Sequence, residues 1–167
     1  ALVAQTNPDL ILLTGDNVYG EFDDAGIMMR ELIDLMEGFE IPWAPVFGNH
    51  DNESKIGVDY QCGLFERGKY CLFKRGEVTG NGNYTVGIAV GDELIRVLHM
   101  LDSNGCVHTD DPSVQKKAGI YPDQLDLVEK KTAQINAASK KAVPAFLAFH
   151  IPHEIFHEAG VEKGYWT

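Results

Sequence analysis

The sequence predicts an α/β fold in a single domain that spans residues 1–167. Three short apolar runs, at 9–14, 42–47 and 145–149, are typical of buried strands, and a polar group follows each of them. Apolar residues at helical spacing lie between the first two runs and again before the third. This alternation of strand and helix is the basis of the predicted fold class.

The first half of the chain contains two of these strands and one helix. DLILLT at 9–14 is a short apolar run that ends at a Gly-Asp-Asn turn. Residues 24–37 form an amphipathic pattern with acidic residues in front and Gly38 behind, which predicts a helix. PWAPVF at 42–47 is expected to be extended, because its two prolines exclude a helix, and it stops at GNHD.

The second half begins with a weakly helical stretch at 54–67. Aliphatic, aromatic and β-branched runs separated by glycines then predict a meander of strands: YCLF at 70–73, YTVGIAV at 84–90 and LIRVLHMLD at 94–102. Residues 122–138 begin with Pro and Asp and carry an apolar stripe, so a surface helix is expected there. The last strand, AFLAF, leads to His150.

The ends of three strands therefore carry polar side chains, and in open α/β sheets ligands bind beyond such ends. Asp16, Asn49 and His150 would supply a carboxylate oxygen, an amide oxygen and an imidazole nitrogen. This mixed set suits iron, manganese or zinc, and a carboxylate such as Asp16 can bridge two cations. His50 would lie beside the metals and protonate a departing oxygen, with Asp51 holding its ring.

GDNVYG at 15–20, GNHD at 48–51 and AFLAFHIP at 145–152 resemble the motifs of the calcineurin-like metallophosphoesterases, which occur in this order. The stretches GNYTVGIAV, LDSNG and GIYPDQLDLVEK are similar to the branch related to purple acid phosphatases. The resemblance implies a four-layer α/β/β/α sandwich, two metal ions, and hydrolysis of a phosphomonoester or phosphodiester by metal-activated hydroxide.

The resemblance also implies a role for each motif residue. Asp16 would be the bridging ligand, and Asn49 and His150 would be ligands of the second metal. His50 would be the acid for the leaving group. Tyr19 stands three residues after Asp16, where the purple acid phosphatases have a tyrosine that ligates ferric iron. Packing of the Tyr19 ring is the alternative interpretation.

Two motifs of that family are missing from the sequence. There is no Asp-x-His before Asp16 and no Gly-His-x-His after His150. We therefore expect a domain truncated at both ends, whose isolated 167 residues bind metal weakly and hydrolyse phosphate esters poorly, because half of the ligand set is absent.

Two further hypotheses stay open. HEIFH at 153–157 has the H-E-x-x-H spacing of a zinc peptidase, and Gly160 fits the longer form of that motif, but Lys163 stands where a third histidine is required. The chain could also keep the sandwich as a catalytically silent binding scaffold.

The composition limits the partners. A net charge of −11 opposes binding to a nucleic-acid backbone, whereas a phosphorylated substrate remains possible if cations hold the phosphate. No apolar run approaches the length of a membrane helix, so we expect no membrane partner. The sequence indicates neither the compartment, nor the oligomeric state, nor the substrate.

Overall fold

The computed structural model describes residues 2–23, 25–105, 118–152, 158–159 and 161–163. Its helices and strands, in chain order, are α1 (Leu2–Thr6), β1 (Ile11–Thr14), η1 (Gly20–Phe22), α2 (Ile27–Glu37), β2 (Trp43–Val46), η2 (His50–Glu53), α3 (Val58–Phe65), β3 (Tyr84–Val90), β4 (Glu93–Met100), α4 (Pro122–Ser139) and β5 (Ala145–Ala148). The predicted α/β class is confirmed, and the arrangement is consistent with a metallophosphoesterase fold.

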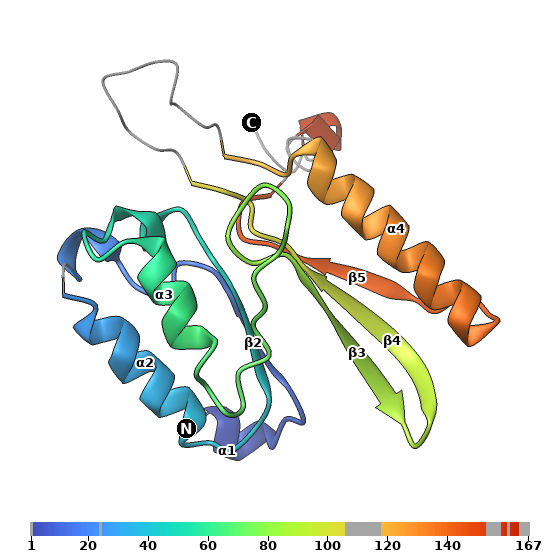
Figure 1. The fold of residues 1–167 in the computed structure, drawn as a ribbon, viewed down its shortest axis with the longest axis horizontal. Helices are drawn as coiled ribbons and strands as arrows, with labels where there is room; N and C mark the ends of the chain where they lie inside the picture. Colours follow the sequence, from blue (N-terminus) through green and yellow to red (C-terminus); the bar gives the residue numbers. More distant parts are fainter. Residues whose placement is uncertain (1, 24, 106–117, 153–157, 160, 164–167) are drawn as a thin grey trace.

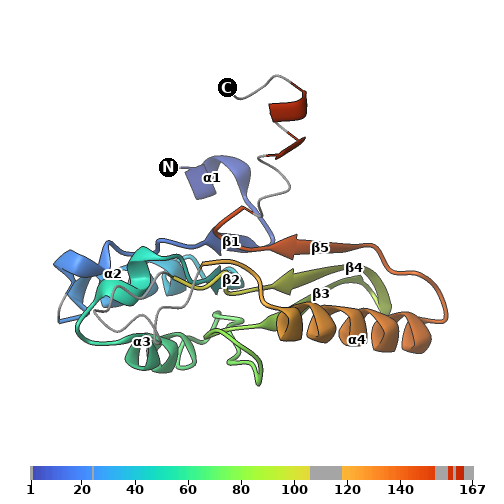
Figure 2. The same cartoon turned by 90° about the horizontal axis from the view of Figure 1, so that it is seen from above.

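The strands form two small sheets. β1 and β2 pair in parallel, which requires the crossover helix α2 between them. In the second sheet, β4 pairs antiparallel with β3 and parallel with β5, and α4 makes the crossover from β4 to β5. The first sheet lies beside α2 and α3, and the second lies beside α4 (Figure 1). In the side view, α1 lies on one side of the strands and α3 and α4 lie on the other (Figure 2).

Some boundaries differ from the predicted ones. YCLF at 70–73 is not a regular strand, although it makes one bridge in which the backbone N–H of Trp43 donates to Tyr70 and that of Leu72 donates to Trp43. The helix predicted at 24–37 begins at Ile27, because Gly26 has a left-handed conformation at its N-cap. Within the stretch predicted to be weakly helical, 54–67, α3 forms at Val58–Phe65, and the separate 3-10 helix η2 precedes this stretch.

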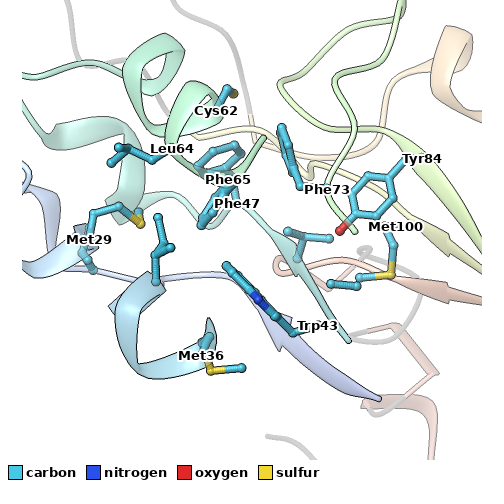
Figure 3. Packing of buried hydrophobic residues seen from close by; sticks show 14 of the residues in the cluster. Met29, Met36, Trp43, Phe47, Cys62, Leu64, Phe65, Phe73, Tyr84 and Met100 are labelled. Carbon is cyan, nitrogen blue, oxygen red and sulfur yellow. The ribbon is translucent and has the colours of Figure 1, made fainter. Parts of the chain in front are cut away.

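A buried aromatic cluster joins the two sheets (Figure 3). Phe65 contacts Trp43, Phe47 and Phe73, with ring centroids 5.7, 5.4 and 5.3 Å away. Phe73 in turn packs against Tyr84, the first residue of β3, whose buried hydroxyl donates a hydrogen bond of 2.7 Å to the carbonyl oxygen of Pro45 in β2. This cluster fixes the position of the β2 end relative to the second sheet.

None of the helices in the described part of the chain combines the length and the apolar character that crossing a bilayer requires.

Candidate functional site

The loop after β1 turns sharply through two left-handed residues, Gly15 (φ 97°) and Asp16 (φ 48°). The left-handed conformation favours glycine at position 15, and a steric constraint requires it as well. A Cβ atom on Gly15 would lie 2.6 Å from the imidazole ring of His150. The close approach of this backbone lets His150, which follows β5, reach the end of β1.

Asp16 and His150 form the centre of the candidate site. Nε2 of His150 lies 3.2 Å from Oδ2 of Asp16, and both side chains are only partly exposed to solvent. Nδ1 of His150 lies 2.9 Å from the carbonyl oxygen of Thr14. Because a carbonyl can only accept, Nδ1 carries a proton, and Nε2 is the ring nitrogen that faces Asp16.

The loop after β2 packs directly on Asp16. Oδ1 of Asp16 accepts a hydrogen bond of 3.1 Å from the backbone N–H of His50. A Cβ atom on Gly48 would lie 2.2 Å from both the backbone nitrogen and Oδ1 of Asp16, so no larger residue fits at position 48 without displacing the carboxylate. Asn49 is the N-cap residue of η2, and its side chain makes no capping hydrogen bond. The three predicted strand ends therefore meet around Asp16.

Asp51 has a different role from the one expected. Its fully buried carboxylate accepts hydrogen bonds from the backbone N–H groups of Val18 (3.0 Å) and Gly48 (2.7 Å) and from the side-chain amide of Asn17 (3.1 Å). Burial raises the pKa of Asp51, and these donors oppose the rise. The expectation that Asp51 holds the His50 ring is corrected, because its oxygens tie the loop after β1 to the loop after β2.

Glu53 is the carboxylate that contacts the ring of His50. Its Oε2 lies 2.8 Å from Nδ1 of His50, and this hydrogen bond is the main cause of the raised pKa of His50. The sequence analysis missed Glu53. Glu53 stands three residues after His50, and the 3-10 turn of η2 brings residues i and i+3 together. Helical structure was expected only from residue 54, so this pairing was not predicted.

The ring of Tyr19 stacks on the ring of His50, with centroids 4.4 Å apart, and it also stacks with the ring of Phe22, with centroids 5.3 Å apart. Tyr19 is half exposed. The stacking is the packing role that the sequence analysis kept as an alternative, and the role of Tyr19 as an iron ligand stays a prediction. Asp16, Tyr19 and Phe22 also line a groove of about 780 Å³, so the centre is open to solvent.

The donor set fits a metal only in part. Asp16 and His150 offer a carboxylate and an imidazole whose Nε2 lies 3.2 Å from it, and Asn49 precedes His50 in the loop that packs on Asp16. Within the described ranges, however, no group of three or more His, Cys, Asp or Glu side chains could hold a metal ion. The alternative zinc motif at 153–157 lies outside the described residues.

The chain is similar to known proteins over most of its length. The family model described as calcineurin-like phosphoesterase matches residues 1–165. The chain is 43% identical over 56 residues, 33% of its length, to a protein of Arabidopsis thaliana named probable inactive purple acid phosphatase 28, of which it covers 14%. No solved structure matches the chain at a significant level.

The alignments with two fungal relatives cover a larger share of this chain. Phosphatase DCR2 of Saccharomyces cerevisiae is 28% identical over 108 residues, which are 58% of this chain and 19% of that protein. An uncharacterized protein of Schizosaccharomyces pombe is 26% identical over 163 residues, 94% of this chain and 29% of that protein. The chain thus spans less than a third of the length of these relatives. With a family model that matches almost all of its residues, the chain belongs to the calcineurin-like phosphoesterase family.

Proposed function

We propose that this domain belongs to an enzyme that hydrolyses phosphate esters, monoesters or diesters, with two metal ions of iron, manganese or zinc. The observation that carries the proposal is the contact between Asp16 and His150, which brings together a carboxylate and an imidazole from opposite ends of the chain. The hydrogen bond from the His50 backbone to Asp16 adds the third strand end to the same place.

Asp16, Asn49 and His150 are the residues that would hold the metals, and Tyr19 is a further candidate. When bound, the cations would polarise the phosphoryl group and activate water for attack. The Thr14 carbonyl supports this assignment, because it keeps the proton on Nδ1 of His150 and leaves Nε2 free to coordinate.

His50 would give a proton to the departing oxygen. Its Nδ1 is engaged with Glu53, so Nε2 is the atom that can act on a substrate, and the stacked ring of Tyr19 limits the rotation of the imidazole. A partly exposed imidazole beside an open groove suits this task. Asp51 then supports the site by fixing the two loops rather than by transferring a proton.

The acidic chain is compatible with an anionic substrate only through such cations. The net charge of −11 repels a free phosphate ester, whereas bound cations reverse the local field. We therefore propose a phosphorylated compound as the partner, and neither a nucleic acid nor a membrane.

The test is hydrolysis of p-nitrophenyl phosphate and bis(p-nitrophenyl) phosphate by the full-length protein supplied with Fe, Mn or Zn. Asn49→Ala should lower turnover by at least about 100-fold, because the loss of even an indirect metal contact costs about 10–100-fold. The matched control is Asp59→Ala, which removes a 91% exposed carboxylate and should leave turnover unchanged. An Asn49→Ala protein with full turnover would overturn the proposal.

A silent scaffold is the second candidate, favoured by the names of relatives that are called probable inactive purple acid phosphatases. A folded, metal-supplied full-length protein with no turnover of either ester would support it. Peptidase activity that disappears with Glu154→Ala would instead identify the zinc peptidase.

A further inference from the structure

The loop that follows β4, residues 101–105, lies against the end of β5. The backbone N–H of Leu101 donates a hydrogen bond of 2.9 Å to the carbonyl oxygen of Ala148. Two residues further along, the side-chain Oγ of Ser103 accepts a hydrogen bond of 2.9 Å from the backbone N–H of Ile151. His150 therefore lies between two residues whose backbones are bonded to the same loop.

Ser103 is itself firmly held. The residue is fully buried, and its carbonyl oxygen accepts a hydrogen bond of 2.6 Å from the backbone N–H of Gly119. The carboxylate of the preceding residue, Asp102, accepts from the backbone N–H groups of Asn104 (2.8 Å) and Asn81 (2.7 Å). Because the loop is held in this way, the hydroxyl of Ser103 can fix the position of the Ile151 backbone.

The same loop also touches the loop that contains Asn49. A Cβ atom on Gly105 would lie 2.4 Å from the side-chain nitrogen of Asn52 and 3.3 Å from the Cα atom of Asn49. Residues 103–105 thus contact both the segment that follows β5 and the segment that follows β2, the two segments with candidate ligands of the second metal.

We propose that Ser103 is a positioning residue that acts on His150 through the main chain of Ile151. Its hydroxyl fixes the backbone on the C-terminal side of His150, so that Nδ1 meets the Thr14 carbonyl and Nε2 meets Asp16. The purpose of this alignment rests on the proposed function, whereas the alignment itself can be tested in protein from which metal has been removed.

The test observes the ring nitrogens of His150 by nuclear magnetic resonance, in metal-free full-length protein labelled with ¹⁵N at histidine. The His150 signal is identified by its loss in His150→Gln. The wild type should show a proton on Nδ1 that is hydrogen-bonded to the Thr14 carbonyl oxygen. Ser103→Ala should shift the His150 ring signals as the hydrogen bond from Nδ1 to the Thr14 carbonyl oxygen loses its fixed geometry, and exchange of the Ile151 amide should become about tenfold faster as its acceptor is lost.

Ser54→Ala is the matched control. Ser54 is also a buried serine with a hydrogen-bonded hydroxyl, which donates to the carbonyl oxygen of Asp23 at 2.7 Å. Its loss should cost similar stability and leave the His150 signal in place. An unchanged His150 signal in Ser103→Ala, or an equal change in both variants, would overturn the proposal. If Ser103→Ala does not fold, Ser103→Cys decides the matter, since a thiol fills the space but accepts poorly.

A zinc titration of the same proteins separates this proposal from the proposed function. Ser103→Ala should lower the affinity for Zn²⁺ about tenfold, as expected when a group behind a metal ligand is removed, and Ser54→Ala should not. A wild-type protein that binds no Zn²⁺, Mn²⁺ or iron would contradict the proposed function, while the ring signal of His150 would still decide the role of Ser103.

Discussion

Two regions of the molecule are each organised by a buried aspartate, and the comparison shows what such a residue does. Asp51, after β2, is fully buried and joins the loops at the ends of β1 and β2. Asp102, after β4, is buried to the same extent and joins the turn at 79–83 to its own loop. In both regions the carboxylate accepts backbone N–H groups that have no strand or helix partner.

The two regions differ in what surrounds the carboxylate. Asp51 is flanked by candidate ligands, which made it resemble a catalytic residue. Asp102 lies among buried amides, since Nε2 of Gln124 donates to Oδ1 of Asn83 (2.7 Å) and to the carbonyl oxygen of Asp102 (2.7 Å). A buried aspartate in a motif is therefore as much a sign of loop fixation as of chemistry.

The largest effect is expected for Asp51→Ala. The substitution leaves two buried backbone N–H groups without their acceptor and removes one of the two hydrogen bonds of the Asn17 amide, which still donates to Val46. An unmade buried hydrogen bond costs about 1–3 kcal/mol, so we expect a loss of about 3–5 kcal/mol in the free energy of unfolding. Urea unfolding measures it. Asp59→Ala, in an exposed ion pair with Arg75, should cost less than about 1 kcal/mol. Equal costs for the two variants would contradict the fixation of the loops by Asp51.

A smaller loss, about 2–4 kcal/mol, is expected for Gln124→Ala in the second region. The buried amide of Gln124 donates two hydrogen bonds, and its oxygen accepts the backbone N–H of Tyr121 at the start of α4 (2.8 Å). Urea unfolding gives the loss, and helix content by circular dichroism should show fraying of α4. Gln134→Ala, on the exposed side of the same helix, is the control. A Gln124→Ala protein as stable as this control would show that the amide network adds nothing.

The smallest effect is a dependence on pH. His99 is buried between Thr85 and Thr132, 3.1 Å from each hydroxyl, and burial lowers its pKa below 6.5. The unfolded chain then binds a proton more readily, so the stability that neutral His99 contributes is complete above pH 6.5 and declines as the pH falls below it. The raised pKa of His50 acts in the opposite sense, with stability lost as the pH rises through its folded-state value.

Unfolding midpoints at about pH 7 and about pH 5 check this expectation. The wild type should lose more stability over this interval than His99→Gln, and His50→Gln should lose more than the wild type. The same loss in all three proteins would contradict the assignment of the pH dependence to these two histidines.

Much of the fold could be predicted, because apolar spacing reports burial along each element. The helix at α2 and the strands β1, β2 and β5 follow from their patterns within a few residues. YCLF at 70–73 has the composition of a strand, but only one bridge to Trp43 forms, since pairing depends on a partner far away in the sequence.

For the candidate site, the sequence predicted which strand ends meet, and Asp16, His50 and His150 do lie in contact. Their roles, and those of Asn49 and Tyr19, remain predictions. The partner of the His50 ring was misassigned because burial of Asp51 cannot be read from GNHD. Ser103 was missed because its contact with Ile151 spans 48 residues and involves no unusual residue type.

The left-handed backbone of Asp16 decides how its chemistry can be probed. At a φ of 48° most side chains with a Cβ are strained, whereas Asp and Asn tolerate this region comparatively well. An alanine there would combine the loss of a carboxylate with a distorted turn, and the two causes could not be told apart. Asp16→Asn keeps the shape of the side chain and of the turn and removes only the negative charge, so its effect can be assigned to the carboxylate.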